Sequence, residues 1–397
     1  MYAAGLVAIG GYLPAQPVPR EKRARLTGFL RRYTPLAPQY IDPIETEGKL
    51  PGFIETNAMG WSSQPWFQAW LERLPEKKRS DPFAGTRERR RVPLDPNSVA
   101  TCIHPHAMLS SDAETLAGAY AIVNAGIDRE SIDLVMVSSL VPDRHVPLNA
   151  SLVQHKLSLP AAGAYNVDTC CSSFITMVEL AESLVRAGVK NNVLVVASAI
   201  DSLINDHSTY HSPYTADAAV AAVISRVEDG FGYMGSHSSS QGSRHRAIVF
   251  RTRSPYLHER TAQGPSYEQE FVTFLDPALI REIGAHAQED VARVARAALE
   301  RAGIRNTDIG FLVTHQPVAW AANAWREAIG VPKDRFLESY ETLANMACAS
   351  VPANLLLALD QQLVHAGEPL LMVSSGVGEN HIALVERVTK RLVNSVL

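Results

Sequence analysis

Short runs of consecutive apolar residues alternate along this chain with longer segments in which apolar residues recur every three or four positions. The first pattern is typical of buried strands, and the second of helices that present one face to a core. The runs at 1–11, 192–198 and 370–375 predict strands, whereas 172–187 and 350–366 predict helices. This alternation predicts an α/β fold with parallel sheets that helices cover on both faces.

The chain also repeats itself. Ala125-Gly126-Ile127 recurs 177 residues later as Ala302-Gly303-Ile304, in each case where a helical pattern gives way to an apolar strand. The same offset relates Val196-Ala197-Ser198 to Val373-Ser374-Ser375. The helix ends at Ala187-Gly188 and Ala366-Gly367 are 179 residues apart, which predicts an insertion of two residues before the second strand.

We therefore expect two duplicated α/β halves, residues 1–250 and 251–397, packed as layered sheets and helices. A site at their junction would draw residues from both copies. The tryptophan-containing segment 24–78 is an irregular insert in the first half, and 230–265, rich in Gly, Ser, His and Arg, is expected to be a surface excursion.

Composition excludes several classes of protein. With 46% hydrophobic and 20% charged residues the chain is globular, and a net charge of −4 argues against nucleic acid as the main partner. No apolar run is long enough to span a bilayer, and the apolar start lacks a basic leader, so we expect a cytoplasmic protein. The four cysteines form no C-x-x-C pair, so no metal site is expected.

Two adjacent cysteines, Cys170 and Cys171, open the predicted helix at 172–187. A thiol at a helix N-terminus meets unpaired N–H groups and the positive end of the helix dipole, and both favour the nucleophilic thiolate. The alternative is that both cysteines are small core residues, the usual role of a free cysteine.

Two further candidates occupy related element ends. His315 follows an apolar strand, where open α/β sheets place their ligands, although a structural histidine at a strand end is the alternative. The repeat maps Asp168 onto Asn345 and Cys171 onto Cys348; Asn345 is a candidate side chain or an ordinary turn residue, and Cys348 is expected to be packing. A cysteine, a histidine and an asparagine at related element ends are less probable by chance than any one alone.

These residues bring out a family resemblance. The chain resembles the thiolase-fold condensing enzymes, specifically 3-oxoacyl-acyl carrier protein synthase III. Five stretches resemble the family's motifs: Gly85-Thr-Arg-Glu-Arg-Arg90 (G-I-x-E-R-R), Cys171-Ser-Ser-Phe174 (C-A-G-F), His315-Gln316 (H-Q-A-N), Asn345 to Pro352 (N-T-S-A-A-S-V-P) and the turn Gly376-Val377-Gly378. The resemblance covers nearly the whole chain except 24–78 and part of 230–265.

The resemblance implies a two-stage reaction on a homodimer. Cys171 would take an acyl group from a thioester of coenzyme A or acyl carrier protein, with the oxyanion bound by the backbone of Cys171, Gly376 and Val377. A malonyl thioester would then lose CO₂, and His315 and Asn345 would stabilise its enolate before carbon–carbon bond formation. No cofactor is implied beyond the pantetheine carrier of the substrates.

Several positions depart from the family and leave alternatives open. Val146 replaces an aromatic residue that reaches the partner's acyl pocket, which predicts room for a longer acyl group or else a neutral exchange; Phe174 is the second predicted pocket residue. The insert 24–78 either covers the substrate tunnel of the active site or packs on the surface. The arginines of 86–91 contact nucleotide phosphates, an acidic carrier protein or solvent. Rival functions are acyl transfer to a hydroxyl or amine, and a non-catalytic partner subunit.

Overall fold

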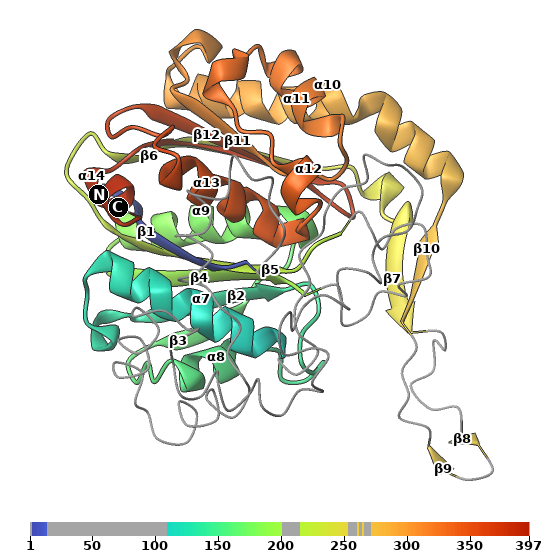
Figure 1. Ribbon diagram of the computed structural model, residues 1–397, viewed down its shortest axis with the longest axis horizontal. Helices are drawn as coiled ribbons and strands as arrows, with labels where there is room; N and C mark the ends of the chain where they lie inside the picture. The colour runs from blue at the N-terminus through green and yellow to red at the C-terminus, as the bar shows by residue number, and fades with distance from the viewer. Residues whose placement is uncertain are drawn as a thin grey trace, which may run out of the picture.

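The computed structural model describes residues 2–13, 109–200, 215–252, 260–261, 264–265 and 271–396. The predicted insert 24–78 and the arginines of 86–91 lie outside these residues. Figure 1 shows five layers, in which helices alternate with two sheets. Helices α9 and α13 lie between the sheets and contact both of them, α7 contacts the outer face of the first sheet, and α10 contacts the second. The predicted α/β class and layered architecture are confirmed.

The first sheet has the strand order β1-β5-β4-β2-β3. β4 and β3 both run parallel to β2, whereas β5 pairs antiparallel with β4 and with β1. The expectation of purely parallel sheets is wrong, because β5 returns beside β4 in the opposite direction. The bounds are β1 Ala4–Tyr12, β2 Leu134–Ser139, β3 Gly163–Asn166, β4 Asn192–Ala199 and β5 Ala218–Arg226.

The second sheet has the order β11-β12-β13-β6, and only its β11–β12 pair is parallel. The prediction of a surface excursion at 230–265 is therefore wrong for its first part, because β6 pairs with β13 along its length despite its many polar residues. The sheets divide between β5 and β6, and the predicted division at residue 250 stays a prediction. The bounds are β6 Gly232–Ser240, β11 Phe311–Thr314, β12 Pro369–Gly376 and β13 Asn380–Arg387.

The longer helices begin and end at recognisable signals. The Asp276 carboxylate accepts hydrogen bonds from the amides of Ala278 and Leu279 at the start of α10, and Gly303 ends that helix in the left-handed conformation. Among the described residues, no helix combines the length and the apolar character that a membrane crossing requires. The bounds are α7 Ser110–Ala125, α8 Ala150–Lys156, α9 Ser173–Arg186, α10 Pro277–Ala302, α11 Ala321–Ile329, α12 Tyr340–Leu343, α13 Ser350–Asp360 and α14 Lys390–Asn394.

Short elements complete the described chain. The antiparallel ladders β7–β10 and β8–β9 lie outside the two main sheets, toward the right-hand edge of Figure 1. Single 3₁₀ turns precede several strands and helices. The strand bounds are β7 Ile248–Thr252, β8 Arg260–Thr261, β9 Gly264–Pro265 and β10 Phe271–Leu275, and the 3₁₀ turns are η2 Arg129–Ser131, η3 Cys170–Ser172, η6 Gly242–Arg244, η7 Asn306–Asp308, η8 Lys333–Arg335 and η9 Ala347–Ala349.

The internal repeat is confirmed at a constant spacing. The starts of η3, α9 and β4 each precede those of η9, α13 and β12 by 177 residues. The predicted two-residue insertion is wrong, because α13 ends at Asp360 and not near residue 366. The shorter helix compensates for a longer connection, and Gln362, rather than Gly367, takes the left-handed conformation just beyond the helix.

Candidate active site

A tight turn between β3 and α9 delivers the two adjacent cysteines. The Asp168 carboxylate accepts a hydrogen bond of 2.7 Å from the backbone N–H of Cys170, which has a left-handed φ of 54°. This conformation is uncommon for a residue with a side chain, and such strain concentrates at functional sites. The following residue, Cys171, is the middle residue of η3 and lies just before the N-terminus of α9, as the sequence predicts.

The two thiols form one titrating unit. Their sulfur atoms lie 3.8 Å apart, with Cys171 buried and Cys170 partly accessible. The hydrogen bond between them lowers the pKa of Cys170 and raises that of Cys171 well above the ordinary thiol value, and burial adds to the rise. The backbone N–H of Val377 acts on both sulfurs in the lowering direction. The pKa at which the first of the two protons is lost is therefore a property of both thiols together and not of either one.

The end of β12 presses its backbone against this turn. A side-chain carbon added to Gly376 would lie 2.4 Å from the carbonyl oxygen of Thr169 and 2.8 Å from the hydroxyl oxygen of Ser172. Only glycine permits this approach. The approach brings Val377, the next residue, beside the two sulfurs, where its N–H can stabilise negative charge.

His315 follows β11 and is held by its backbone. Its N–H donates to the Val373 carbonyl oxygen at 3.0 Å, and its ring, 1% exposed, lies near the Trp325 ring. Burial lowers the pKa of His315 to about 3, so the imidazole is neutral at physiological pH. Among the described residues, its Nδ1 atom has no hydrogen-bond partner.

Asn345 repeats the role that Asp168 plays in the first half. Its Oδ1 atom accepts a 2.8 Å hydrogen bond from the N–H of Ala347, which has a left-handed φ of 42°. The backbone carbonyl oxygen of Asn345 accepts a hydrogen bond from the amide of Ala216, which connects the turn to the segment before β5. Because the oxygen of the side chain is engaged in the turn, the Asn345 amide nitrogen is left to point elsewhere as a donor.

Short chains of contacts connect these segments. Consecutive residues of β12 hold two of them, since Ser374 donates its hydroxyl to the Cys171 carbonyl oxygen at 3.0 Å and Val373 accepts from His315. Cys171 packs against Ala347, two residues after Asn345. The backbones that carry the three predicted residues thus meet at one end of the sheets, and the arrangement of the three functional groups themselves stays a prediction.

The remaining sequence candidates lie in different settings. Cys348 is buried and its thiol donates to the Ser198 carbonyl oxygen at 3.1 Å, which confirms its expected packing role. Phe174 is fully buried in the main core, and Val146, 86% exposed, lies on the surface of the single chain. Their assignment to an acyl pocket stays a prediction.

Two supporting residues are absent from the sequence-based set. Ser374 fixes the Cys171 carbonyl, and Gln316 binds the 337–340 segment through hydrogen bonds from its side-chain amide to Leu337 and from the amides of Ser339 and Tyr340. The pattern offers no signal for Ser374. The internal repeat already aligns Asp168 with Asn345, but the sequence gives no sign that both side chains hold a turn.

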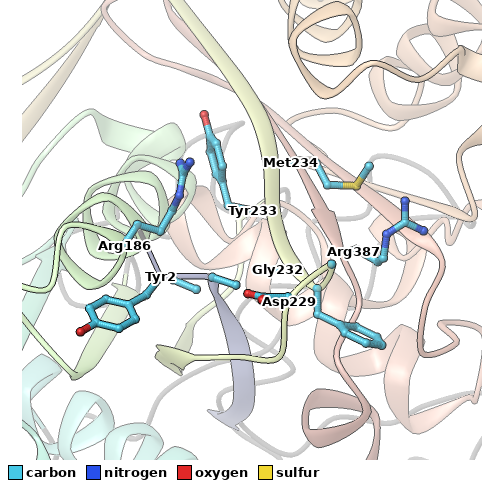
Figure 2. A pocket seen from close by; sticks show the side chains of 11 residues that line it. Tyr2, Arg186, Asp229, Gly232, Tyr233, Met234 and Arg387 are labelled. Carbon is cyan, nitrogen blue, oxygen red and sulfur yellow. The ribbon is translucent and has the colours of Figure 1, made fainter.

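Figure 2 shows a separate hollow of about 350 Å³ at the far end of α9. Arg186, which ends α9, stacks over the Tyr233 ring at 4.4 Å there, and Arg387 and Asp229 also line the hollow. Since Cys171 lies at the opposite end of α9, this hollow is not part of the candidate active site.

Two family models match parts of this chain. Residues 165–242 match the family model 3-oxoacyl-[acyl-carrier-protein] synthase III, and residues 299–388 match the model of its C-terminal part. The chain is a thiolase-fold protein that resembles 3-oxoacyl-[acyl-carrier-protein] synthase III. The two matched ranges hold Cys171, His315 and Asn345.

Individual synthase III proteins extend the resemblance over most of the chain. The chain is 26% identical to β-ketoacyl-[acyl-carrier-protein] synthase III of Clostridium perfringens over 77% of its length and 91% of the relative. It is 29% identical to that of Roseiflexus castenholzii over 66% of its length and 78% of the relative. The crystal structure of 3-oxoacyl-[acyl-carrier-protein] synthase III from Aquifex aeolicus superposes with a TM-score of 0.67 at 20% identity, covering 97% of this chain and 99% of that chain.

We predict that His315 stays neutral down to about pH 4, because burial lowers its pKa to about 3. The unfolded chain binds this proton near pH 6.5, so the free energy of unfolding should fall as the pH drops below that value. Imidazole nitrogen chemical shifts, followed between pH 5 and 8 and assigned by loss of the signal in His315→Gln, should show no titration. A titration of the His315 signal near pH 6.5 would contradict the buried, neutral ring.

Proposed function

We propose that the chain catalyses acyl transfer to Cys171 followed by decarboxylative Claisen condensation with a malonyl-type thioester, which gives a 3-oxoacyl product. The observation that carries this proposal is the position of Cys171, at the N-terminus of α9 and in a turn that the Gly376 backbone approaches closely. The 3-oxoacyl synthases among its relatives support the reaction type.

In the first stage the Cys171 thiolate attacks the carbonyl carbon of an acyl thioester. The oxygen gains negative charge and accepts hydrogen bonds from the backbone N–H groups of Cys171 and Val377, at the end of β12 marked by Gly376. Collapse of this intermediate breaks the bond to the carrier sulfur, which leaves as a thiolate. Cys170 supports this stage, because its thiolate, favoured by a lowered pKa, can accept the proton that Cys171 must lose.

In the second stage a malonyl thioester binds with its thioester oxygen toward His315 and Asn345. Loss of CO₂ leaves an enolate, whose oxygen accepts hydrogen bonds from the neutral imidazole and the amide. The enolate carbon then attacks the acyl-Cys171 carbonyl, and collapse returns the thiolate of Cys171 and releases the 3-oxoacyl thioester. Neutral donors suit this stage because they stabilise the enolate oxygen without protonating it outright.

The two rival functions are less favoured. Transfer of the acyl group to a hydroxyl or amine needs a base for the incoming nucleophile, and the His315 pKa of about 3 makes this imidazole a weak base. A non-catalytic subunit needs neither a cysteine at the helix N-terminus nor an oriented Asn345 amide. The pairing of donors supports condensation.

The proposed partners are thioesters of coenzyme A or acyl carrier protein, and the proposed location is the cytoplasm. The substrates bring their own pantetheine, so the mechanism requires no further cofactor. The low number of cysteines supports a reducing compartment.

A homodimer is proposed on the open edge of the first sheet. β3 is the edge strand, and its Tyr165 side chain is 52% exposed. The backbone amides of Gly163 and Val167 donate toward β2, to the carbonyl oxygens of Asp133 and Val137. Successive amides point to opposite sides of a strand, so the amide of Ala164 faces away from β2. Among the described residues no strand pairs with the outer side of β3, and such an edge is a template for a second strand. A second copy would carry exposed Val146 toward its partner's acyl pocket.

We predict that an acyl-CoA adds one acyl group to the wild-type protein and none to Cys171→Ala, measured by intact-protein mass spectrometry and peptide mapping. Cys170→Ala is the matched control and should retain the label, because it keeps the proposed nucleophile. Labelling of Cys171→Ala together with loss of label in Cys170→Ala would assign the nucleophile to Cys170.

We predict that Asn345→Asp acylates Cys171 at a rate close to wild type but releases CO₂ from malonyl-CoA about 10²-fold more slowly, as expected for loss of one donor. The aspartate keeps an oxygen for the Ala347 amide, just as Asp168 does for Cys170. It replaces the N–H donor by a second carboxylate oxygen, whose negative charge also opposes the enolate. Radioactive CO₂ release is the measurement. Unchanged decarboxylation would exclude Asn345 as a donor.

We predict that Ala164→Pro converts the protein from dimer to monomer, because proline removes an outward amide and blocks a partner strand. Ala164→Ser keeps the amide and should stay dimeric. Light scattering after size-exclusion chromatography gives both masses. A wild-type protein that runs as a monomer, or a dimeric Ala164→Pro variant, would remove the β3 edge from the proposed interface.

A further inference from the structure

The Val377 N–H lies in the short hairpin turn that follows the last β12–β13 pair, Gly376 and Asn380. This turn joins β12 to β13 in three residues, and its last residue, Glu379, has a left-handed φ of 60°. This conformation costs free energy for a glutamate, so interactions with the surroundings are needed to hold it. The groups that bind Glu379 therefore help to set the position of Val377, two residues earlier in the same turn.

Glu379 is bound from the side opposite the cysteines. Its Oε2 atom lies 3.4 Å from Nη1 of Arg244, and its carbonyl oxygen accepts the amide of Gln241 at 2.9 Å. Next to it, the Asn380 side chain accepts the Ser240 hydroxyl at 2.6 Å. The segment that ends β6 and forms η6 thus holds the end of the turn through three contacts.

The other side of the same turn reaches the cysteine segment. The carbonyl oxygen of Asn380 accepts the Ser172 hydroxyl at 3.1 Å, and the Gly376 backbone packs on Thr169. The turn is therefore fixed between η3, which carries Cys171, and η6, which carries Arg244. A change in either support would move the Val377 N–H relative to the sulfurs.

Arg244 is the centre of a nearly buried charge cluster. Besides Glu379, its guanidinium donates to Asp290 at 3.0 Å and to Glu282 at 2.9 Å, both from α10. The donor atoms of Asp290, Glu379 and His381 lie within 4.8 Å of one another, a spacing that a metal ion could also use. Here the Arg244 Nη1 atom contacts both carboxylates and supplies the positive charge that they require.

We infer that Arg244 and Glu379 are positioning residues that hold the oxyanion-binding turn against Cys171. This inference rests on the proposed function, because it assigns the pair to the step in which the Val377 N–H stabilises the oxyanion. The geometry behind it is the uninterrupted connection from α10 through Arg244 and Glu379 to the turn. Neither residue touches the reacting atoms.

The role has a specific kinetic consequence. Acyl transfer to Cys171 passes through an oxyanion, whereas alkylation of the same thiol by iodoacetamide does not. Loss of the Arg244–Glu379 contact should therefore slow acylation without a matching fall in alkylation. Loss of packing or of the thiolate would slow both reactions together.

The test compares Arg244→Ala, Glu379→Ala and Glu379→Gln with wild type in three measurements: single-turnover acylation by an acyl-CoA, iodoacetamide alkylation of Cys171, and thermal unfolding. Acylation should fall about 10-fold to 10²-fold in the two alanine variants, within the range for a displaced oxyanion donor. KM for the acyl-CoA and the alkylation rate should stay within about threefold. Glu379→Gln keeps an acceptor for Arg244 and should recover part of the lost rate.

Arg246→Ala is the matched control, because Arg246 is exposed and two residues from Arg244. It should acylate at the wild-type rate. If Arg244→Ala fails to fold, the Glu379→Gln and Glu379→Ala pair carries the test alone.

The outcomes distinguish failure of the positioning role from failure of the proposed function. An active wild type whose Glu379→Ala variant acylates normally, or loses acylation and alkylation equally, overturns the positioning role and leaves the proposed function intact. A wild type that forms no acyl-Cys171 overturns the proposed function and, with it, this role.

Discussion

The close approach of the Gly376 backbone to the turn before Cys171 is the constraint on which the candidate site depends. Two parts of the chain that are about 200 residues apart touch there with no room for a side chain. The contact fixes the Val377 N–H beside the sulfurs, and it also brings Ser374 to the Cys171 carbonyl. An oxyanion-binding group has to be in place before the charge develops, and close packing of rigid elements is how a fold achieves this.

Duplication explains why a site forms at this junction. Each half builds the same strained turn, with an Asp168 or Asn345 oxygen that accepts the amide two residues later. In the first half the turn presents a thiol, whereas in the second the equivalent Cys348 is buried and bonded to a backbone carbonyl. The same backbone device thus supplies a nucleophile on one side and an oriented amide on the other.

Local patterns predict the parts of the fold that depend on local chemistry. Apolar runs predict β1, β4 and β12, and the helix that follows Cys171 is correct within one residue. The repeat correctly aligns Cys171 with Cys348. Strand direction is not a local property, so β5 and β6 were missed: their pairing is decided by which neighbours remain free in each sheet. The end of α13 was misplaced because Gln362 takes a conformation that the sequence assigns to glycine.

For the site, sequence places each residue at the end of an element but gives no account of its surroundings. The neutral state of His315 follows from burial beside Trp325, and the shared proton of Cys170 and Cys171 follows from a 3.8 Å contact between their sulfurs. Both effects arise from tertiary packing that removes water. Among the described residues, the charged groups of the Arg244 cluster are paired with one another, whereas His315 and Asn345 are neutral donors whose strength grows as water is excluded. Neutral donors held in this way can stabilise a transient negative charge without a charge of their own.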